Sequence, residues 1–205
     1  MFLDKLCKTN PNLIQIAVHM HQQKQIMPDT YVVDVDQFIA NAKAILQKAN
    51  EQNIELYYML KQIGRNPYLA MELEKVGYKG AVVVDFKEAE VMMKYHLHIA
   101  HAGHLVQIPS MMINQLVEYG CDYITVYSYE KLVEINEAAK KVGISQKICI
   151  RVIGENDRIY SGQTAGFYLD QLEELVQKAK NLTHIEIAGV DNFPCFLYDE
   201  TTKQI

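Results

Sequence analysis

The sequence predicts an α/β fold built on a parallel sheet. Three observations support this prediction: short runs of β-branched and aromatic residues recur along the chain, stretches with helical spacing separate them, and capping residues and glycines stand at the boundaries. Because parallel strands need long crossover connections, strand-then-helix units repeated seven times indicate a parallel sheet with crossover helices.

The seven apolar runs are the predicted strands. They lie at residues 31–35, 54–60, 80–85, 97–101, 122–127, 147–153 and 184–190. Residues 1–28 precede this pattern, mix apolar and amide side chains, and end at Pro28. We therefore expect an N-terminal helical extension over residues 1–28 and one main domain over residues 29–205.

The segments between the strands carry helical patterns. After the first strand, one helix face collects the apolar residues Phe38, Ile39, Ala42, Ile45, Leu46 and Ala49. Residues suited to begin the helices are Asp36, Asn66, Ser128 and Asp170. Glycines that would close helices in the left-handed conformation are Gly77, Gly120 and Gly143.

Two closures of such a sheet are open at this point, a doubly wound sheet and a (β/α)8 barrel of the TIM type. A dinucleotide-binding sheet would place a glycine-rich turn after the first strand, but residues 34–37 contain no glycine. A barrel needs eight strands and usually about 250 residues. With seven βα units visible in 205 residues, we predict an incomplete barrel with two unpaired sheet edges.

Composition and charge exclude several functional classes. The chain is 49% apolar and 22% charged, which is typical of a globular protein, and its net charge of −5 gives no basic surface for nucleic acid. The sequence contains no apolar run of about 18 residues, the length that would predict a membrane span. Cysteines are scattered without a paired motif, so we expect a cytoplasmic protein with four reduced thiols. They are Cys7, Cys121, Cys149 and Cys195.

Lys61, at the end of the second predicted strand, is the leading candidate for chemistry. A lysine at the mouth of a barrel would be partly desolvated, which lowers its pKa and favours the neutral amine that forms Schiff bases. The alternative is a lysine whose ammonium simply reaches solvent, which is the commoner case. The position alone leaves both interpretations open.

Further candidates follow later strands, because active sites of such folds lie where strands end. His101 and His104 close the fourth predicted strand, and a structural role remains the commoner one for such histidines. The polar loop at residues 154–166 is long for a barrel turn, which is typical of either a functional loop or a surface excursion. Asp191, Asn192 and Cys195 follow the seventh strand and could reach the same mouth.

These residues give the chain a resemblance to a known family. Over about residues 29–198, it resembles the amino-terminal barrel of the alanine racemase-like (fold type III) pyridoxal-phosphate enzymes, through TYVVDVD at 30–36, Asn41 and Lys61. More narrowly, it resembles the YhfX-type branch of that family. Four segments carry the narrower resemblance: MLKQIGRNP at 59–67, HAGHLVQIP at 101–109, DRIYSGQTAG at 157–166 and NFPCFLYD at 192–199.

The resemblance implies a cofactor and a reaction class. Lys61 would hold pyridoxal 5'-phosphate as a Schiff base and then serve as the base that removes the α-proton of an amino-acid substrate, as in a racemase. Arg65 takes the place of a tyrosine that touches the cofactor phosphate in the racemases. From the shared motifs we also expect cofactor contacts from His104, Gln163 and Asn192.

The resemblance also shows where this chain departs from the racemases. Their second acid–base group is a tyrosine of the partner subunit's C-terminal β-domain, and this sequence contains no such domain, so we interpret the chain as a fragment with impaired turnover. A homodimer that pairs the open sheet edges, or a partner chain that supplies the remainder, is expected. Two alternatives stay open: a non-catalytic pyridoxal-phosphate homeostasis protein of the same fold, and a barrel lyase that uses a metal or Lys61 without this cofactor.

Overall fold

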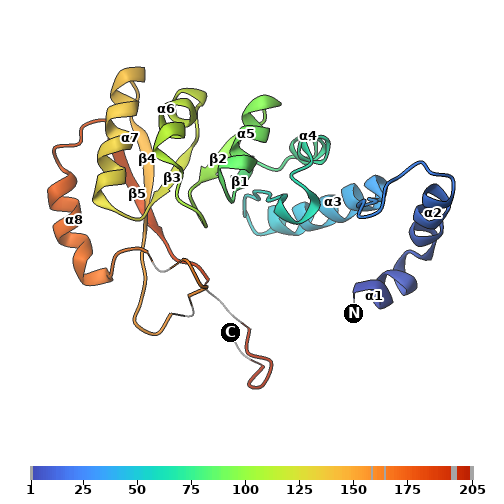
Figure 1. The fold of residues 1–205 in the computed structure, drawn as a ribbon. Coiled ribbons are helices and arrows are strands. Elements are labelled where there is room, and N and C mark those ends of the chain that lie inside the picture. The colour runs from blue at the N-terminus through green and yellow to red at the C-terminus, as the bar shows by residue number, and fades with distance from the viewer. Residues whose placement is uncertain (1, 158, 164, 195–197, 204–205) are drawn as a thin grey trace.

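The fold is that of a computed structural model, which describes residues 2–157, 159–163, 165–194 and 198–203. Arg158, Thr164 and Cys195, which lie in the sequence motifs above, fall outside the described residues. At the centre is a five-stranded parallel sheet in which the spatial order of the strands follows their order in the chain (Figure 1). Its strands are β1 (Ala81–Val83), β2 (Ile99–Ala102), β3 (Tyr123–Val126), β4 (Gln146–Arg151) and β5 (Ile185–Asp191).

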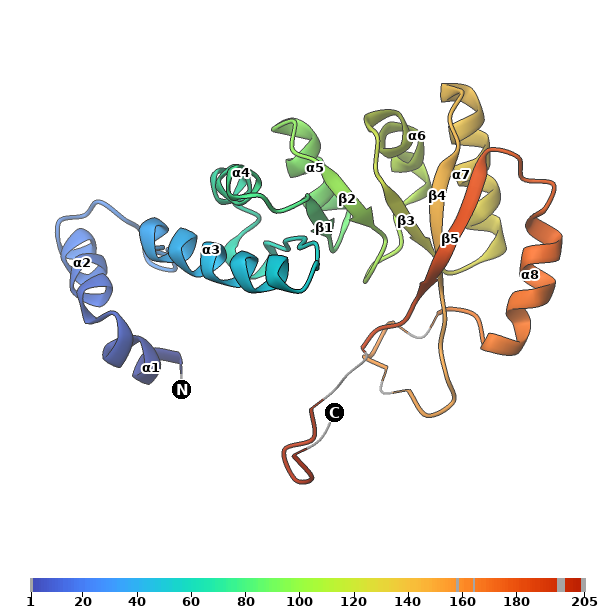
Figure 2. The same cartoon turned by 180° about the vertical axis from the view of Figure 1, so that it is seen from behind.

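Eight α-helices and two short 3-10 helices accompany the sheet in the described part of the chain. Helices α6, α7 and α8 cover one face of the sheet, whereas α1 and α2 lie at the far end of the molecule, beyond α3 (Figures 1 and 2). The α-helices are α1 (Phe2–Thr9), α2 (Pro11–Gln22), α3 (Val35–Glu51), α4 (Pro67–Val76), α5 (Phe86–Lys94), α6 (Ser110–Tyr119), α7 (Tyr129–Val142) and α8 (Leu172–Ala179). The 3-10 helices are η1 (Lys61–Ile63) and η2 (Leu169–Gln171).

The α/β class and the parallel sheet are confirmed, but two of the seven predicted strands do not form. Residues 31–34 have no strand structure, and residues 54–60 contribute only an isolated bridge between Tyr58 and Ala81. A strand needs a neighbour for its backbone groups, and no strand pairs with residues 31–34 among the described residues. The structure is therefore an open sheet rather than a closed barrel.

The helix boundaries agree with the predicted caps in most places. Asn66 and Ser128 cap α4 and α7 with their side chains, and Gly77, Gly120 and Gly143 end α4, α6 and α7. The first cap was predicted at the wrong residue. Asp34, rather than Asp36, begins α3, because its carboxylate accepts the Gln37 N–H at 3.0 Å and an amide N–H of Asn10 at 2.7 Å. Asp170 lies inside η2 and caps no α-helix.

The two faces of the sheet differ in chemistry because side chains alternate along each strand. The face under the helices is apolar and fully buried, with Ile124, Val126, Ile148 and Ile150 at its centre. The opposite face, here called the polar face, carries His101, Thr125, Cys149, Arg151 and Asp191, as the strand register shows. No helix among the described residues has the length and hydropathy to cross a membrane.

Candidate functional site

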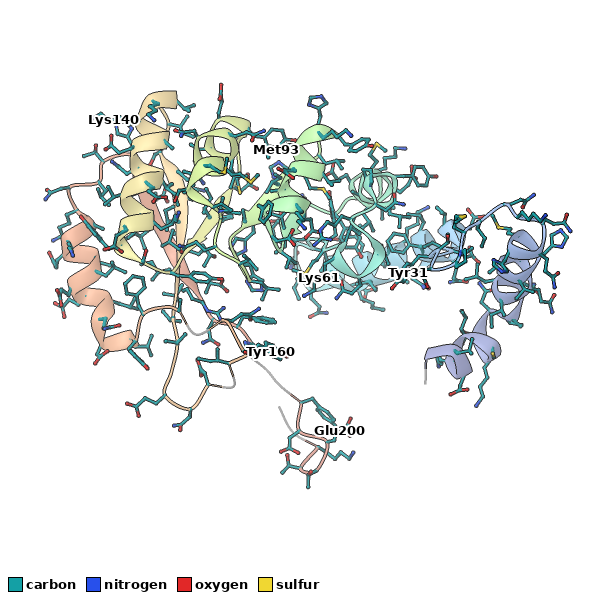
Figure 3. The ribbon with its side chains drawn as sticks, in the orientation of Figure 1. Tyr31, Lys61, Met93, Lys140, Tyr160 and Glu200 are labelled. Carbon is teal, nitrogen blue, oxygen red and sulfur yellow. The ribbon has the colours of Figure 1, made fainter. Side chains whose placement is uncertain are left out.

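Lys61 lies at the first position of η1, directly after the extended segment 54–60. This segment runs beside β1, since the Tyr58 N–H donates to the Gly80 carbonyl at 3.0 Å and the Val82 N–H donates to the Tyr58 carbonyl at 2.8 Å. The lysine therefore emerges where a parallel strand next to β1 would end (Figure 3). Its side chain is half-buried, and the ammonium group has no hydrogen bond or ion pair with any described residue.

Two acidic residues at the start of α5, the N-cap Asp85 and Glu88 of the first turn, fix the segment that carries Lys61. The Glu88 side chain is fully buried, and its carboxylate accepts the Leu60 N–H at 3.1 Å and the Val84 N–H at 2.8 Å. Asp85 caps α5 through the Glu88 N–H at 2.9 Å and forms an ion pair with Arg65 at 2.6 Å. Leu60, directly before the lysine, and Arg65, four positions after it, are thus both held by the start of α5.

Arg65 lies in the same turn as Lys61, but its guanidinium is already engaged by Asp85. Its backbone is left-handed, with φ of 55°, a conformation that few non-glycine residues adopt. Its Nε is buried and has no partner among the described residues. The predicted phosphate contact by Arg65 stays a prediction, because this arginine would have to share its charge with Asp85.

A cavity of about 760 Å³ opens beside this turn, between the N-terminal helices and the start of α3. Gln62 and Ile63, the two residues after Lys61, contribute to its wall together with Asp34 and Asn41. Its size is typical of a space for a small molecule. Lys61 itself is not in the wall, so this cavity adjoins the lysine without containing it.

A second group of residues, here called the strand-end cluster, gathers at the carboxyl ends of β2, β3 and β5. It consists of His101, His104, Thr125 and Asp191. The His101 Nε2 lies 2.6 Å from the Thr125 hydroxyl, which donates to the Asp191 carboxylate at 3.2 Å. The same carboxylate oxygen lies 3.2 Å from the His104 Nδ1. The structure thus brings together His104, which follows β2, and Asp191, which ends the edge strand β5.

Burial and charge set the protonation of this cluster. Burial lowers the pKa of His101 to about 4, although the nearby Asp191 carboxylate acts in the opposite direction. For Asp191, burial acts to raise the pKa, but the hydrogen bond from His104 and the neighbouring positive charges outweigh it and lower the pKa. At neutral pH the cluster therefore holds a carboxylate and a neutral His101.

The loop that carries His104 is held in place by β3. Gly103 has φ of 82°, and a Cβ atom there would lie only 2.5 Å from the Thr125 carbonyl oxygen, so this close approach requires glycine. The Tyr127 hydroxyl donates to the His104 carbonyl at 2.9 Å, and the Tyr127 N–H donates to the Gln107 side chain at 3.0 Å. Burial raises the pKa of Tyr127 to about 12, so it remains a donor at any physiological pH.

Arg151, at the end of β4, is a site residue that the sequence reasoning missed. Its side chain is 2% exposed, its Nη2 donates to the Phe193 carbonyl, and its Nε and Nη1 have no partner among the described residues. The signal in the sequence was an arginine in a strand otherwise read as apolar. A buried guanidinium with free donors is typical of a group that meets an anion.

Asn192 and Gln163, two of the predicted cofactor contacts, occupy different surroundings. The Asn192 amide donates to the Val152 carbonyl at 3.1 Å and to the Asp157 carboxylate at 2.8 Å, so it holds the polar loop against the end of β5. Gln163 is half-buried within that loop, where its N–H donates to the Tyr160 carbonyl at 3.0 Å. The described residues contain no group of three or more side chains arranged to hold a metal ion.

Comparison with known proteins places this geometry in context. The sequence is 44% identical to the uncharacterized protein YhfX of Escherichia coli (strain K12) over all 205 residues, and the chain spans 53% of that relative. Diaminopimelate decarboxylase from Helicobacter pylori complexed with L-lysine has a similar fold, with a TM-score of 0.65 at 20% identity over 85% of this chain and 46% of that one. Alanine racemase from Clostridium difficile 630 gives a TM-score of 0.58 at 20% identity over 83% and 42% of the two chains.

The sequence also matches the family described as alanine racemase, N-terminal domain, over residues 33–205. The matched residues include the turn from Lys61 to Arg65, the strand-end cluster and the polar loop at residues 154–166. It agrees with the fold resemblance to racemase and decarboxylase structures, all of which are longer chains. The chain therefore belongs to the alanine racemase N-terminal domain family, and this membership implies pyridoxal 5'-phosphate as its cofactor.

Proposed function

We propose that this chain is the cofactor-binding part of a pyridoxal-phosphate enzyme that acts on an amino acid through Lys61. The observation that carries the proposal is the half-buried Lys61, whose ammonium has no partner among the described residues and which lies where the segment beside β1 ends. An unpaired one at the catalytic edge of a parallel sheet suits covalent attachment to a carbonyl compound.

The side chains present include the kinds of group that this cofactor requires. Lys61 would hold the cofactor through its amine. Arg151 offers buried donors without partners, which suits an anionic group of the cofactor or the substrate. When bound, the cofactor supplies an electron-withdrawing ring that makes the α-proton of an attached amino acid acidic.

The chain's own residues then determine the reaction class. With the cofactor and an amino acid bound, the neutral Lys61 amine would accept the α-proton at Nζ. Glu88 holds the Leu60 backbone just before Lys61, and Asp85 pairs with the Arg65 side chain just after it, so both ends of the turn that carries the amine are fixed to the start of α5. We infer a racemase-like proton abstraction as the chemistry that Lys61 supports.

The assembly and cellular setting extend the same proposal. The β5 strand pairs only with β4 among the described residues, which leaves a sheet edge available to a second copy or to further chain. We infer a dimeric cytoplasmic enzyme. Because the chain spans about half of its curated relative, we expect little or no turnover from these 205 residues alone.

The test is an absorbance titration of the purified chain with pyridoxal 5'-phosphate, followed by borohydride reduction and peptide mass mapping. We expect a yellow band that reduction bleaches and a cofactor mass fixed on Lys61. Lys61→Ala should lose both. Lys79→Ala is the matched control, because Lys79 is an exposed lysine near the opposite end of β1 that pairs with Glu55 at 3.5 Å. A folded wild-type chain that shows no band would overturn the proposal.

A further inference from the structure

The hydrogen bonds of the strand-end cluster admit one consistent arrangement of protons. A carboxylate only accepts, so Asp191 must receive a proton-bearing Nδ1 from His104 and a hydroxyl proton from Thr125. The Thr125 hydroxyl then has only its lone pairs left, and it must accept the Nε2 proton of His101. His104 is therefore fixed with its proton on Nδ1.

The Nδ1 of His101 ends the chain of hydrogen bonds on one side, and the Nε2 of His104 ends it on the other. Neither nitrogen has a hydrogen-bond partner in the part of the chain that the structure describes. The His104 imidazole is kept in orientation by an edge contact with the Phe193 ring, with ring centres 5.1 Å apart, and by His101 at 5.6 Å. With 18% of its side chain exposed, His104 is held firmly and is still reachable by a ligand.

His104 and Lys61 approach the strand ends of the sheet from different sides. Lys61 ends the segment beside β1, at one side of the sheet, whereas the His104 ring is tied to Asp191 at the end of β5, on the other side. Figure 3 shows Lys61 near β1 and Tyr160, whose ring lies 6.1 Å from that of Phe193, toward the ends of β4 and β5. A molecule attached to Lys61 that extends along the strand ends toward β5 would therefore approach the unpartnered Nε2 of His104.

We propose that His104 is the second acid–base group of the site and that Asp191 is its positioning residue. This inference rests on the proposed function of Lys61. In one direction the neutral Lys61 amine takes the α-proton from one side of the substrate and becomes an ammonium, while the protonated His104 gives its Nε2 proton to the other side and becomes neutral. Substrate and product then carry the same atoms and charge, and the reverse step restores both residues.

The charged and titratable groups around His104 suit this cycle. Asp191 from β5 accepts the Nδ1 hydrogen bond of His104, and this hydrogen bond, with a smaller effect of the Arg151 guanidinium from β4, lowers the pKa of the Asp191 carboxyl against the effect of burial. His101 from β2 is neutral, because burial lowers its pKa to about 4, and the pKa of Tyr127 from β3 is raised to about 12, so neither takes the proton at neutral pH. The His104 Nε2 has no hydrogen-bond partner among the described residues and its side chain is partly exposed, so it can meet a ligand.

A second histidine–aspartate pair provides a matched control. His98 and Asp122 lie at the opposite ends of β2 and β3, where the His98 Nε2 is 2.7 Å from the carboxylate and both side chains are more than two-fifths exposed. This pair uses the other ring nitrogen, so its proton should sit on Nε2. The two histidines are expected to be opposite tautomers in the same chain.

The first measurement is the tautomer of each histidine, by long-range proton–nitrogen NMR on the chain without cofactor. We expect His104 with its proton on Nδ1 and His98 with its proton on Nε2. Asp191→Asn should abolish the Nδ1 preference of His104, and Asp122→Asn should leave it unchanged. A His104 that carries its neutral-form proton on Nε2 overturns the proposal whatever the cofactor does.

The second measurement asks whether His104 faces the group on Lys61. The cofactor is fixed to Lys61 by borohydride, and the rate of histidine modification by diethyl pyrocarbonate is followed by peptide mass mapping. Occupancy of nine-tenths should slow the reaction of His104 about tenfold and leave His98 unchanged, and Lys61→Ala treated in the same way should show no protection. Unprotected His104 in a chain that carries the cofactor on Lys61 overturns this inference, whereas failure to fix any cofactor on Lys61 overturns the proposed function instead.

Discussion

Removing the Glu88 carboxylate should destabilise the whole fold and loosen the turn that carries Lys61. Glu88 is 1% exposed, and both of its oxygens accept backbone N–H groups, one from Leu60 and one from Val84. These two donors belong to the segment before the lysine and to the end of β1. Glu88 therefore joins an irregular segment to the sheet by side-chain bonds, in a place where strand pairing is limited to one bridge.

The expected magnitude follows from the number of donors left unsatisfied. Glu88→Ala strands both buried N–H groups, at about 1–3 kcal/mol each, which gives about 2–6 kcal/mol in the free energy of unfolding. Glu88→Gln keeps one acceptor oxygen and faces the other N–H with an amide donor, so about 1–3 kcal/mol should be lost. The free energy of unfolding should therefore decrease in the order wild type, Glu88→Gln, Glu88→Ala, because the variants keep two, one and no acceptor oxygens.

Urea denaturation followed by circular dichroism measures these differences. Glu90→Gln is the matched control, because Glu90 is an exposed carboxylate on the same helix and should change stability by less than about 0.5 kcal/mol. The rate of borohydride fixation of the cofactor on Lys61 should fall in Glu88→Gln under conditions where the protein remains folded. A Glu88→Ala variant that is as stable as Glu90→Gln would refute the reasoning.

Three further predictions concern pH, reactivity and the neighbouring ion pair. Because burial lowers the pKa of His101 from its usual 6.5 to about 4 in the folded chain, the unfolded chain binds more protons between these values, and the free energy of unfolding should fall by about 3 kcal/mol as pH falls from 6.5 to 4. Urea unfolding of His101→Gln should show a smaller loss over that range. Among the described thiols, exposed Cys7 should react fastest with a disulfide reagent and Cys121 slowest, because Cys121 is buried and burial raises its pKa. Peptide mass mapping measures the rates, and a fast reaction of Cys121 would contradict the prediction. Asp85→Asn keeps the cap of α5 but loses the Arg65 pair and should cost about 1 kcal/mol in thermal unfolding, less than Asp85→Ala, which loses both; an Asp85→Asn variant as stable as the wild type would show that the pair contributes nothing.

The sequence pattern predicted the central sheet well because hydrophobic periodicity and pairing agreed there. The strands predicted at residues 122–127 and 147–153 contain β3 and most of β4, whose neighbours complete their hydrogen bonds. Residues 31–35 and 54–60 are also rich in apolar and aromatic side chains, but pairing decides whether such a segment becomes a strand. The cap at Asp34 was missed because its partner Asn10 lies in another helix.

The candidate site was predictable only where residues follow strands in sequence. Lys61, His104 and Asn192 were identified in this way, and their cofactor contacts remain predictions. Glu88 and Asp85 were missed because their roles depend on α5 lying beside the lysine turn, which no local pattern reveals. The pairing of His104 with Asp191, 87 positions apart, likewise depends on the loop reaching across the sheet.

The strand order of the sheet has a consequence for how the chain is made. Each strand from β2 onward pairs with the strand synthesised just before it, so every new strand leaving the ribosome meets a partner that is already in place. Translation proceeds at about 5–20 residues per second, which is slow compared with the formation of one strand–helix unit. The sheet can therefore grow one strand at a time, and Asp191 arrives last to complete the cluster around His104.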